Sequence, residues 1–311
     1  MTRAHTLSIV QINDTHGYLE PHAELVWTAA GPFYKTMGGY ARIATLLKRA
    51  RDENRDGVIA LDNGDTFHGT YPAVVSKGEA LIPLVNALNL DAMTAHWEFA
   101  WGSKHFKEMT GRLNHPMLAI NCYDKQTSAR VFPASMIVER ASLRVGIIGI
   151  AATIIDKSMP PHFSEGVRFT LGVDELPAEI ARLRIEQGAN LIVVLSHFAF
   201  TGVSSCLRAV TARISPLWYR TSARSGFRAG TLVSLSVGAC GVWAPRAALD
   251  FFCVMHRRRW PLAGPKGRSP TAGRSRCVVM VASALNLHLK RRRLYAGRLR
   301  PPSRSEKSPV H

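Results

Sequence analysis

Acidic residues almost disappear from the last third of this 311-residue chain. Residues 201–311 contain 21 Lys and Arg but only 2 Asp and Glu, which gives them a net charge of +19. Residues 1–200 contain 19 basic and 20 acidic residues, so the overall charge of +18 describes neither part. A strongly basic balance is typical of nucleic-acid-binding proteins. Its confinement to one end excludes that interpretation for the first 200 residues.

Cysteine and isoleucine also change in frequency near residue 200. Before residue 200 the only cysteine is Cys122, and after it the only isoleucine is Ile214. The last third also has 18 Arg against 3 Lys. A single cysteine excludes a disulfide framework from the first part and is typical of a reducing compartment. We therefore divide the chain into residues 1–200, which form the N-terminal part of one domain, and a basic, Arg- and Ser-rich tail, residues 201–311.

Long apolar runs are missing as well. The chain begins Met1-Thr2-Arg3-Ala4-His5, without the apolar core and small-residue cleavage site of a secretory signal. As written, the sequence predicts a cytoplasmic protein, and a start site missed upstream would make it periplasmic. The tail stretch Ala229–Ala244 is apolar, but about sixteen residues interrupted by Ser234 and Ser236 are too few for a membrane span.

Short apolar runs alternate with helical patterns in residues 1–200, which predicts an α/β fold with at least partly parallel strands. Residues 20–37 are expected to be loop, because Pro21, Gly31 and Pro32 break regular structure. We expect strands at 6–12, 57–61, 91–95, 117–121, 134–138, 143–150 and 189–195, and helices at 40–51, 79–88, 104–113 and 173–187.

Side chains that can bind a metal follow four of these strands. Asp14, Asp65, His96 and His197 each come just after the carboxyl end of an apolar run, and His16 follows Asp14. In open α/β sheets that edge forms the ligand crevice. Two divalent ions that share a carboxylate can activate a water and neutralise a phosphate ester. Asp65 is the best bridge; Asp14 and His16 would bind one ion, and His96 and His197 the other.

Residues 5–200 resemble the calcineurin-like metallophosphoesterases, in particular the 5′-nucleotidase branch. The motifs that carry the resemblance are Asn13-Asp14-Thr15-His16-Gly17, Gly64-Asp65, Ala95-His96-Trp97-Glu98-Phe99 and Leu195-Ser196-His197. The resemblance implies a four-layer α/β/β/α sandwich, incomplete in this chain. It also implies two divalent ions, Mn or Zn, bound by Asp14, His16, Asp65, His96 and His197. The implied reaction is hydrolysis of a small phosphoester such as a nucleotide.

The third motif departs from the family in two places. His96 stands where the family usually has a ligand asparagine, and Trp97 stands where it usually has a catalytic histidine. No catalytic residue is therefore assigned. The sequence His-Trp-Glu-Phe resembles the sulfur-oxidation thiosulfohydrolases, so release of sulfate is an alternative reaction. Asn13, Glu98 and His68 are candidates for orienting a ligand or touching substrate. For His68 an ordinary structural role is favoured, and Glu98 could equally cap the next helix.

The tail lacks the Gly-His-Thr-His type motif with which the family completes both metal shells. Its histidines are His256, His288 and His311. A reading-frame slip near Thr201 would explain the missing motif, the arginine bias and the loss of acids. The tail would then be largely unstructured and the activity impaired. The alternative is a genuine tail that makes this a non-enzymatic, basic nucleic-acid-binding protein. On the leading interpretation neither a specific nucleic acid nor a membrane is expected as a partner.

Overall fold

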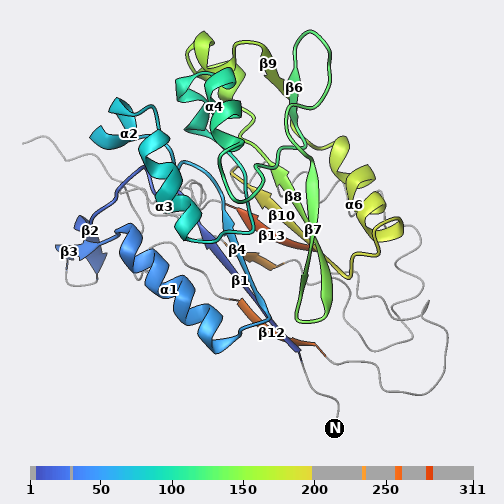
Figure 1. The fold of residues 1–311 in the computed structure, drawn as a ribbon, viewed down its shortest axis with the longest axis horizontal. Coiled ribbons are helices and arrows are strands. Elements are labelled where there is room, and N and C mark those ends of the chain that lie inside the picture. Colours follow the sequence, from blue (N-terminus) through green and yellow to red (C-terminus); the bar gives the residue numbers. More distant parts are fainter. Residues whose placement is uncertain (1–4, 29–30, 198–232, 236–255, 261–277, 283–311) are drawn as a thin grey trace, which may run out of the picture.

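The computed structural model describes residues 5–28, 31–197, 233–235, 256–260 and 278–282. Two β-sheets pack face to face, and helices cover the outer face of each sheet (Figure 1). The fold is a mixed α/β fold, and its described layers follow the order α/β/β/α that the sequence analysis expected.

The first sheet has the strand order β12-β1-β4-β5. The strands β1, β4 and β5 run parallel, while β12 pairs antiparallel with β1. Their carboxyl ends therefore lie at the same edge of the sheet. The bounds of these strands are His5–Ile12 for β1, Val58–Asp62 for β4, Ala92–Met93 for β5 and His256–Trp260 for β12. The helices that cover this sheet are α1 (Tyr40–Glu53), η1 (Glu79–Leu81), α3 (Ile82–Ala87) and α4 (Ser103–Thr110).

The second sheet has the order β11-β13-β10-β8-β7. β7 (Ser135–Arg140) and β8 (Leu143–Ile150) form the antiparallel hairpin that the sequence predicted. β10 (Leu191–Ser196) pairs parallel with β8, and β13 (Val278–Ala282) and β11 (Val233–Leu235) continue the sheet in parallel. α6 (Glu175–Ile185) packs on its outer face.

The alternation of side chains along β1 explains the layering. Leu7 and Ile9 belong to the apolar cluster between the two sheets. Val10 and Ile12 belong to the cluster under the helices of the first sheet. Successive side chains of a strand point to opposite faces, so a strand with apolar residues on both faces must be covered on both faces. β10 is buried along its whole length for the same reason.

Residues 20–37 are not a loop, and that prediction was wrong. They contain the antiparallel hairpin of β2 (His22–Thr28) and β3 (Gly31–Met37). Gly31 and Pro32 occupy the first two positions of β3, where a proline is tolerated because it does not interrupt a central ladder. The breaker residues mark one end of a strand here instead of excluding strands altogether.

Three other segments differ in detail from the sequence-based expectation. The expected strand at 117–121 makes only an isolated bridge, between Met93 and Met117. The expected helix at 79–88 is divided into η1 and α3. The short α2 (Tyr71–Val75) was not expected. The remaining short elements are η2 (Trp97–Trp101), β6 (Cys122–Asp124), α5 (Ile155–Ser158), η3 (Pro161–Ser164) and β9 (Val167–Phe169).

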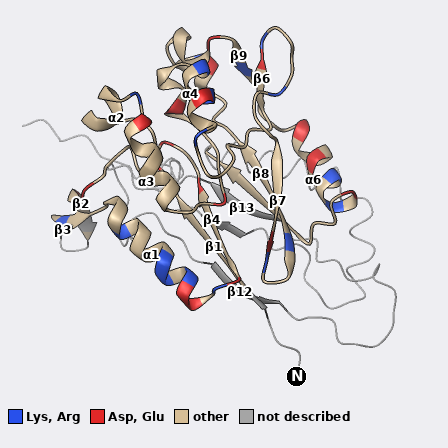
Figure 2. Cartoon of the chain, viewed as in Figure 1, with Lys and Arg blue, Asp and Glu red and all other residues tan. Residues whose placement is uncertain are grey.

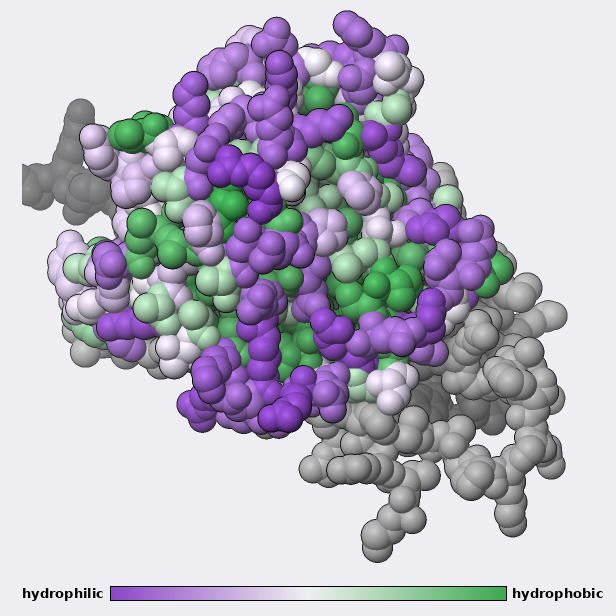
Figure 3. Space-filling view, in the orientation of Figure 1, coloured by the Kyte–Doolittle hydropathy of each residue, from purple (hydrophilic) through white to green (hydrophobic). Residues whose placement is uncertain are grey.

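The described surface mixes both signs of charge. Lys, Arg, Asp and Glu are interspersed over α1, α4 and α6 (Figure 2). On α1, Lys48 pairs with Asp52 and Arg49 pairs with Glu53, both at i,i+4 spacing. Apolar and polar residues also alternate over the face in Figure 3. This pattern agrees with the near-zero net charge of residues 1–200.

Three short segments of the tail are strands of the two sheets, whereas the sequence analysis expected a largely unstructured tail. The rest of residues 198–311 lies outside the described residues, including the basic cluster at 290–293 and most of the apolar stretch at 229–244. Within the described part, no helix has the length and apolar character to cross a membrane. The division near residue 200 and the nucleic-acid-binding alternative remain predictions.

Candidate metal centre

The structure brings together the strand-end residues that the sequence singled out. Asp14 and His16 follow β1, and Asp65 follows β4. His96 follows β5, and His197 follows β10 in the other sheet. All five side chains lie within hydrogen-bonding or ion-pairing distance of at least one other member. Residues far apart in the chain therefore converge at the carboxyl edges of two sheets, as the strand-end rule predicts.

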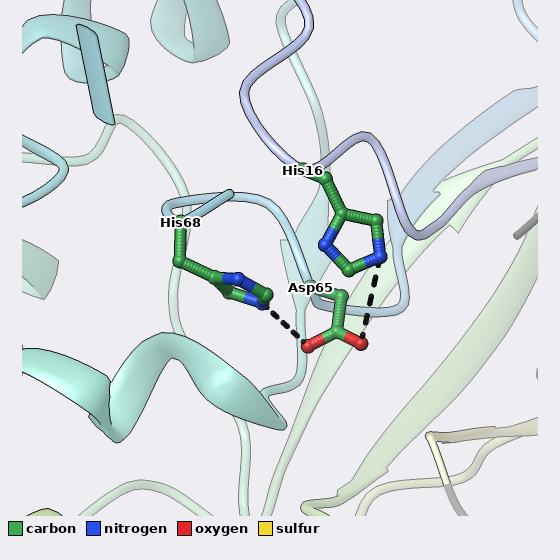
Figure 4. Close-up of side chains that lie close together, drawn as sticks. All are labelled: His16, Asp65 and His68. Atoms are coloured by element: carbon green, nitrogen blue, oxygen red, sulfur yellow. Dashed lines mark hydrogen bonds and ion pairs between the residues drawn. The ribbon is translucent and has the colours of Figure 1, made fainter. Parts of the chain in front are cut away.

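Asp65 is at the centre of this cluster. Its Oδ2 lies 3.1 Å from Nδ1 of His96, 3.3 Å from Nε2 of His197 and 4.0 Å from Nε2 of His16. Figure 4 shows the Asp65 carboxylate between the rings of His16 and His68. One oxygen thus faces three imidazoles that come from three different loops. A carboxylate in that position is suited to contact two cations at once.

Asp14 supplies the second carboxylate of the centre. Its Oδ1 lies 3.7 Å from Nε2 of His16 and 3.9 Å from Nε2 of His197. Its Oδ2 accepts a short hydrogen bond from the side-chain amide of Asn13. Asn13 is in turn held by Gln11, whose Nε2 lies 2.9 Å from Asn13 Oδ1. Asn13 is therefore placed to orient Asp14.

The backbone of the centre is held in an uncommon conformation. Asp14, His16 and Asp65 have positive φ values of 53°, 47° and 60°. Non-glycine residues in this region are strained and persist where the surrounding structure fixes them. Backbone hydrogen bonds between the loop after β1 and the loop after β4 hold these conformations. The Asp14 N–H donates to the Gly64 carbonyl at 2.9 Å, and the His16 N–H donates to the Asp65 carbonyl at 2.8 Å. Three of the candidate ligands are therefore held in strained backbone conformations.

Gly64 is required beside Asp65. Its φ is +92°, and an added Cβ would lie 3.1 Å from both the Ala95 Cα and the Thr94 carbonyl oxygen. The loops that carry Asp65 and His96 approach each other closely only because this residue has no side chain. The Gly-Asp pair of the second motif thus has a steric reason as well as a chemical one.

Glu98 links the loop that carries Asp65 to the loop that carries His96. It is fully buried, and its two carboxylate oxygens accept separate backbone hydrogen bonds. Oε1 accepts from the Thr66 N–H at 2.6 Å, and Oε2 accepts from the His96 N–H at 2.7 Å. Glu98 therefore positions residues next to Asp65 and at His96. It lies within η2, whose N-cap residue is His96, and the next helix, α4, has Gly102 at its N-cap, so the contacts of Glu98 match the orienting role that the sequence left open and not the capping role.

Charge in the centre is balanced between carboxylates and imidazoles. Burial on its own would lower the pKa of His197, but the hydrogen bond and negative charge of Asp65 outweigh it and raise the pKa to about 9. The pKa of Asp65 is lowered, because hydrogen bonds from the surrounding imidazoles, that of His197 first, outweigh the effect of burial. Nearby, burial raises the pKa of Asp62 to about 7. The carboxylates at the centre thus stabilise positive charge placed next to them, on an imidazole or on a cation.

The donor set fits divalent cations. Two groups have ligand atoms close enough to share an ion: His16, Asp65 and His68, and Asp65, His96 and His197. Nε2 of His96 is buried and has no hydrogen-bond partner among the described residues. Its Nδ1, which faces Asp65 Oδ2 at 3.1 Å, is the nitrogen placed to reach an ion beside Asp65. Imidazole with carboxylate is a donor set that suits Zn and Mn.

His68 and Trp97 contact Asp65 in ways that the sequence did not specify. His68, for which a structural role was favoured, lies with its Nε2 2.9 Å from Asp65 Oδ1. The Trp97 N–H donates to the same oxygen at 2.9 Å. The Trp97 ring is 37% exposed, and its centroid lies 5.7 Å from that of His68 and 5.9 Å from that of His96. Only the i,i+3 spacing of Asp65 and His68 hinted at their contact.

Comparison with known proteins finds relatives that are 5′-nucleotidases. No family model matches the chain. A probable 5′-nucleotidase of Treponema pallidum is 32% identical over 202 residues, which cover 62% of this chain and 33% of the relative. A 5′-nucleotidase precursor of Thermus thermophilus has 27% identity and a TM-score of 0.56, over 65% of this chain and 39% of that one. The chain resembles the 5′-nucleotidase branch of the metallophosphoesterase fold.

Two further structures support the fold alone. A calcineurin-like phosphoesterase of Bacillus subtilis has 20% identity and a TM-score of 0.53, over 64% of both chains. The sulfate thiohydrolase SoxB of Thermus thermophilus has 21% identity and a TM-score of 0.58, over 65% of this chain and 45% of that one. The chain spans about a third of the length of the curated relatives it matches. Curated relatives include a probable 5′-nucleotidase, an apyrase and a 5′-nucleotidase of Vibrio cholerae.

Proposed function

We propose that this chain is the N-terminal part of a metal-dependent phosphoester hydrolase of the 5′-nucleotidase type. The observation that carries the proposal is the convergence of two carboxylates and three imidazoles from four strand ends on Asp65 Oδ2 and Asp14 Oδ1. The similarity to 5′-nucleotidases supports a nucleotide or another small phosphoester as the substrate.

The centre is proposed to hold two divalent ions, Mn or Zn. Asp14 and His16 would hold one ion, His96 and His197 the other, and Asp65 would contact both. Bound cations would supply an activated water and neutralise charge on the transferring phosphoryl group. The residues of the chain would position the ions: Asn13 orients Asp14, and Glu98 fixes the backbone at His96.

Trp97 determines what the chain can do for the leaving group. An indole N–H has no proton to exchange near neutral pH. The partly exposed ring stands beside the imidazoles of His68 and His96, where it forms an apolar wall. Proton transfer to a leaving alkoxide is therefore not assigned to this position. The proposed reaction favours esters whose leaving groups need little protonation.

Impaired activity is part of the proposal. The curated matches extend over about 200 residues, 62–63% of the chain, which is close to the length of the segment before the change in composition. A frame slip near Thr201 would remove the last ligand motif of the family. The coding DNA around codon 200 tests this directly. Recovery of a Gly-His-Thr-His motif in another frame would support the slip, and its absence from every frame would contradict it.

The activity is tested with the full chain and a panel of substrates. Purified protein, stripped of metal and reloaded with Mn²⁺ or Zn²⁺, is assayed with nucleoside monophosphates and a chromogenic phosphodiester. We expect weak, metal-dependent release of phosphate that chelation abolishes. Hydrolysis that persists without metal, or no binding of Mn²⁺ or Zn²⁺, would contradict the proposal. Stoichiometric binding of two Mn²⁺ with normal turnover would contradict the proposed impairment alone.

A second candidate is release of sulfate from a thiosulfonate carried by a partner. The observation that favours it is the His96-Trp97-Glu98-Phe99 sequence, which resembles the thiosulfohydrolases, together with a fold like that of SoxB. An S-sulfonated cysteine peptide added to the substrate panel separates the two candidates. Sulfate release without phosphate release would favour the second.

A further inference from the structure

We propose that His68 is a positioning residue that fixes which oxygen of Asp65 contacts the metals. His68 donates its Nε2–H to Oδ1, so that Oδ2 would be the oxygen left to contact bound ions. This inference rests on the proposed metal centre and decides among the roles that the sequence left open for His68. It concerns the geometry of the bridge, not the identity of the substrate.

The two oxygens of Asp65 have different surroundings. Oδ1 lies 2.9 Å from the Trp97 backbone nitrogen and 2.9 Å from His68 Nε2. A backbone N–H can only donate, and a carboxylate oxygen accepts two hydrogen bonds with its lone pairs. The lone pairs of Oδ1 are therefore both engaged. His68 must carry its proton on Nε2 to complete this pair of donors.

Oδ2 faces the candidate ligands instead. The ring nitrogens of His96 and His197 lie 3.1 and 3.3 Å from it, and that of His16 lies 4.0 Å away. Separations of about 3 Å are those expected between donors that share one cation at bond lengths near 2.1 Å. The division between an anchored oxygen and a bridging oxygen follows from these contacts.

Packing holds the His68 ring in place independently of its hydrogen bond. Gly69 has a φ of +112°, and a Cβ there would lie 2.5 Å from the His16 carbonyl oxygen. The Thr70 N–H donates to that carbonyl at 3.2 Å. The His68 ring meets the His16 ring edge-on at 4.8 Å and lies beside the Trp97 ring. The backbone next to His68 therefore packs closely against the loop that carries His16. This packing orients the His68 ring toward Asp65 (Figure 4).

The competing role is that of a direct ligand. His68, His16 and Asp65 have donor atoms within 4.8 Å of one another, so His68 could bind an ion itself. In that case its Nε2 could not carry a proton toward Oδ1. The two roles differ in what a neutral hydrogen-bond donor can replace. A glutamine amide can donate to Oδ1 from nearly the same place, but it is a poor ligand for Zn²⁺ or Mn²⁺ compared with imidazole.

The experiment measures metal binding, which does not depend on turnover. Full-length wild type, His68→Ala and His68→Gln are stripped of metal and titrated calorimetrically with Mn²⁺. Pulsed electron paramagnetic resonance of the bound Mn²⁺ then counts directly coordinated imidazole nitrogens. His105→Ala is the matched control, because His105 bonds to the Lys77 carbonyl and belongs to neither ligand group.

We expect His68→Ala to weaken Mn²⁺ binding by about 10–100-fold, the usual range for a lost partner of a metal ligand. His68→Gln should restore binding close to that of wild type, with an unchanged number of coordinated nitrogens. A fall in that number in both variants would overturn the proposal and make His68 a ligand. Unchanged binding in His68→Ala would overturn it in favour of a packing role. Wild type that binds no Mn²⁺ or Zn²⁺ would overturn both this inference and the proposed function.

Discussion

The ligands proposed for the two ions differ in how closely they approach the carboxylates and in how well they are enclosed. We call His96 and His197 the β10 side of the centre, and Asp14 and His16 the β1 side. On the β10 side, His96 and His197 lie within 3.3 Å of Asp65 Oδ2, and the other ring nitrogen of each is enclosed. The His197 nitrogen is bonded to a backbone carbonyl at 2.5 Å, and that of His96 is buried without a partner in the described residues. On the β1 side, His16 lies 3.7 Å from Asp14 and 4.0 Å from Asp65, and its side chain is 22% exposed.

This contrast bears on where an ion would bind more tightly. Charges attract more strongly where water is excluded, because the effective dielectric constant is lower. Ligands that are already in place also lose less freedom when the ion arrives. His197 and His96 meet both conditions better than His16 does. We therefore infer a tighter site on the β10 side and a weaker, more exchangeable one on the β1 side.

The largest effect is expected from Asp65→Asn, because Asp65 belongs to both ligand groups. The amide keeps the shape of the side chain but removes the charge that both ions would share. We expect loss of both ions and a fall in phosphoester hydrolysis of more than about 1000-fold, since several kcal/mol of metal-derived stabilisation would disappear. Metal analysis after gel filtration measures this. Retention of one tightly bound ion would show that the two sites do not share Asp65.

The next prediction separates the halves. His197→Ala should abolish the tighter phase of a two-phase Mn²⁺ titration, with a loss of about 100-fold or more, above the range for outer partners. His16→Ala should remove the weaker phase and leave the tighter one. The control is His105→Ala, which should keep both phases. If His16→Ala removed the tighter phase instead, the order of the two sites would be the reverse of the one inferred here.

Much of the fold could be predicted from the sequence. The buried strand β10 is apolar at nearly every position, and β1 and β8 carry apolar side chains on both faces, so their place and their coverage on both faces could be predicted. The β2–β3 hairpin was missed because Gly31 and Pro32 are equally compatible with a loop and with a strand start. Pairing between β2 and β3 decides between these, and pairing is a long-range property that local propensity does not encode.

The candidate site shows the same limit. The strand-end rule found Asp14, Asp65, His96 and His197 because parallel strands share an edge. It could not distinguish the two oxygens of Asp65, since that difference depends on the Trp97 N–H and on the path of Gly69 past His16. The positive φ values at the ligands were equally out of reach. Local rules thus found which residues meet, while the contacts that orient them needed coordinates.

A smaller effect is expected from Glu98→Gln, which tests whether Glu98 holds the backbone at His96 in place. Both oxygens of Glu98 accept backbone N–H groups, so the amide nitrogen of glutamine would face a donor at one of them. We expect a loss of about 1–3 kcal/mol in the free energy of unfolding, the cost of an unsatisfied buried group. Urea titration measures this, with Glu108→Gln, at an exposed position of α4, as the control. Equal stability of the two variants would contradict the role given to Glu98.

The last prediction uses a histidine outside the centre to show what the carboxylates do. His115 is buried, and both of its ring nitrogens lack hydrogen-bond partners among the described residues. With no acid compensating it among the described residues, burial lowers the pKa of His115 to about 4, whereas Asp65 raises that of His197. A buried imidazole thus stays neutral unless a carboxylate compensates its charge.

His115 should therefore make the protein sensitive to acid. As pH falls from about 6.5 to about 4, the unfolded chain binds a proton at His115 that the folded chain does not, so stability decreases. The full loss is on the order of 3 kcal/mol. His115→Leu should remove this part of the pH dependence, measured by urea unfolding at pH 7, 5.5 and 4, while Mn²⁺ affinity at neutral pH stays unchanged. His162→Ala, at an exposed position, serves as the control and should keep the wild-type slope. Parallel pH profiles of wild type and His115→Leu would mean that His115 titrates normally and that burial alone does not set its charge.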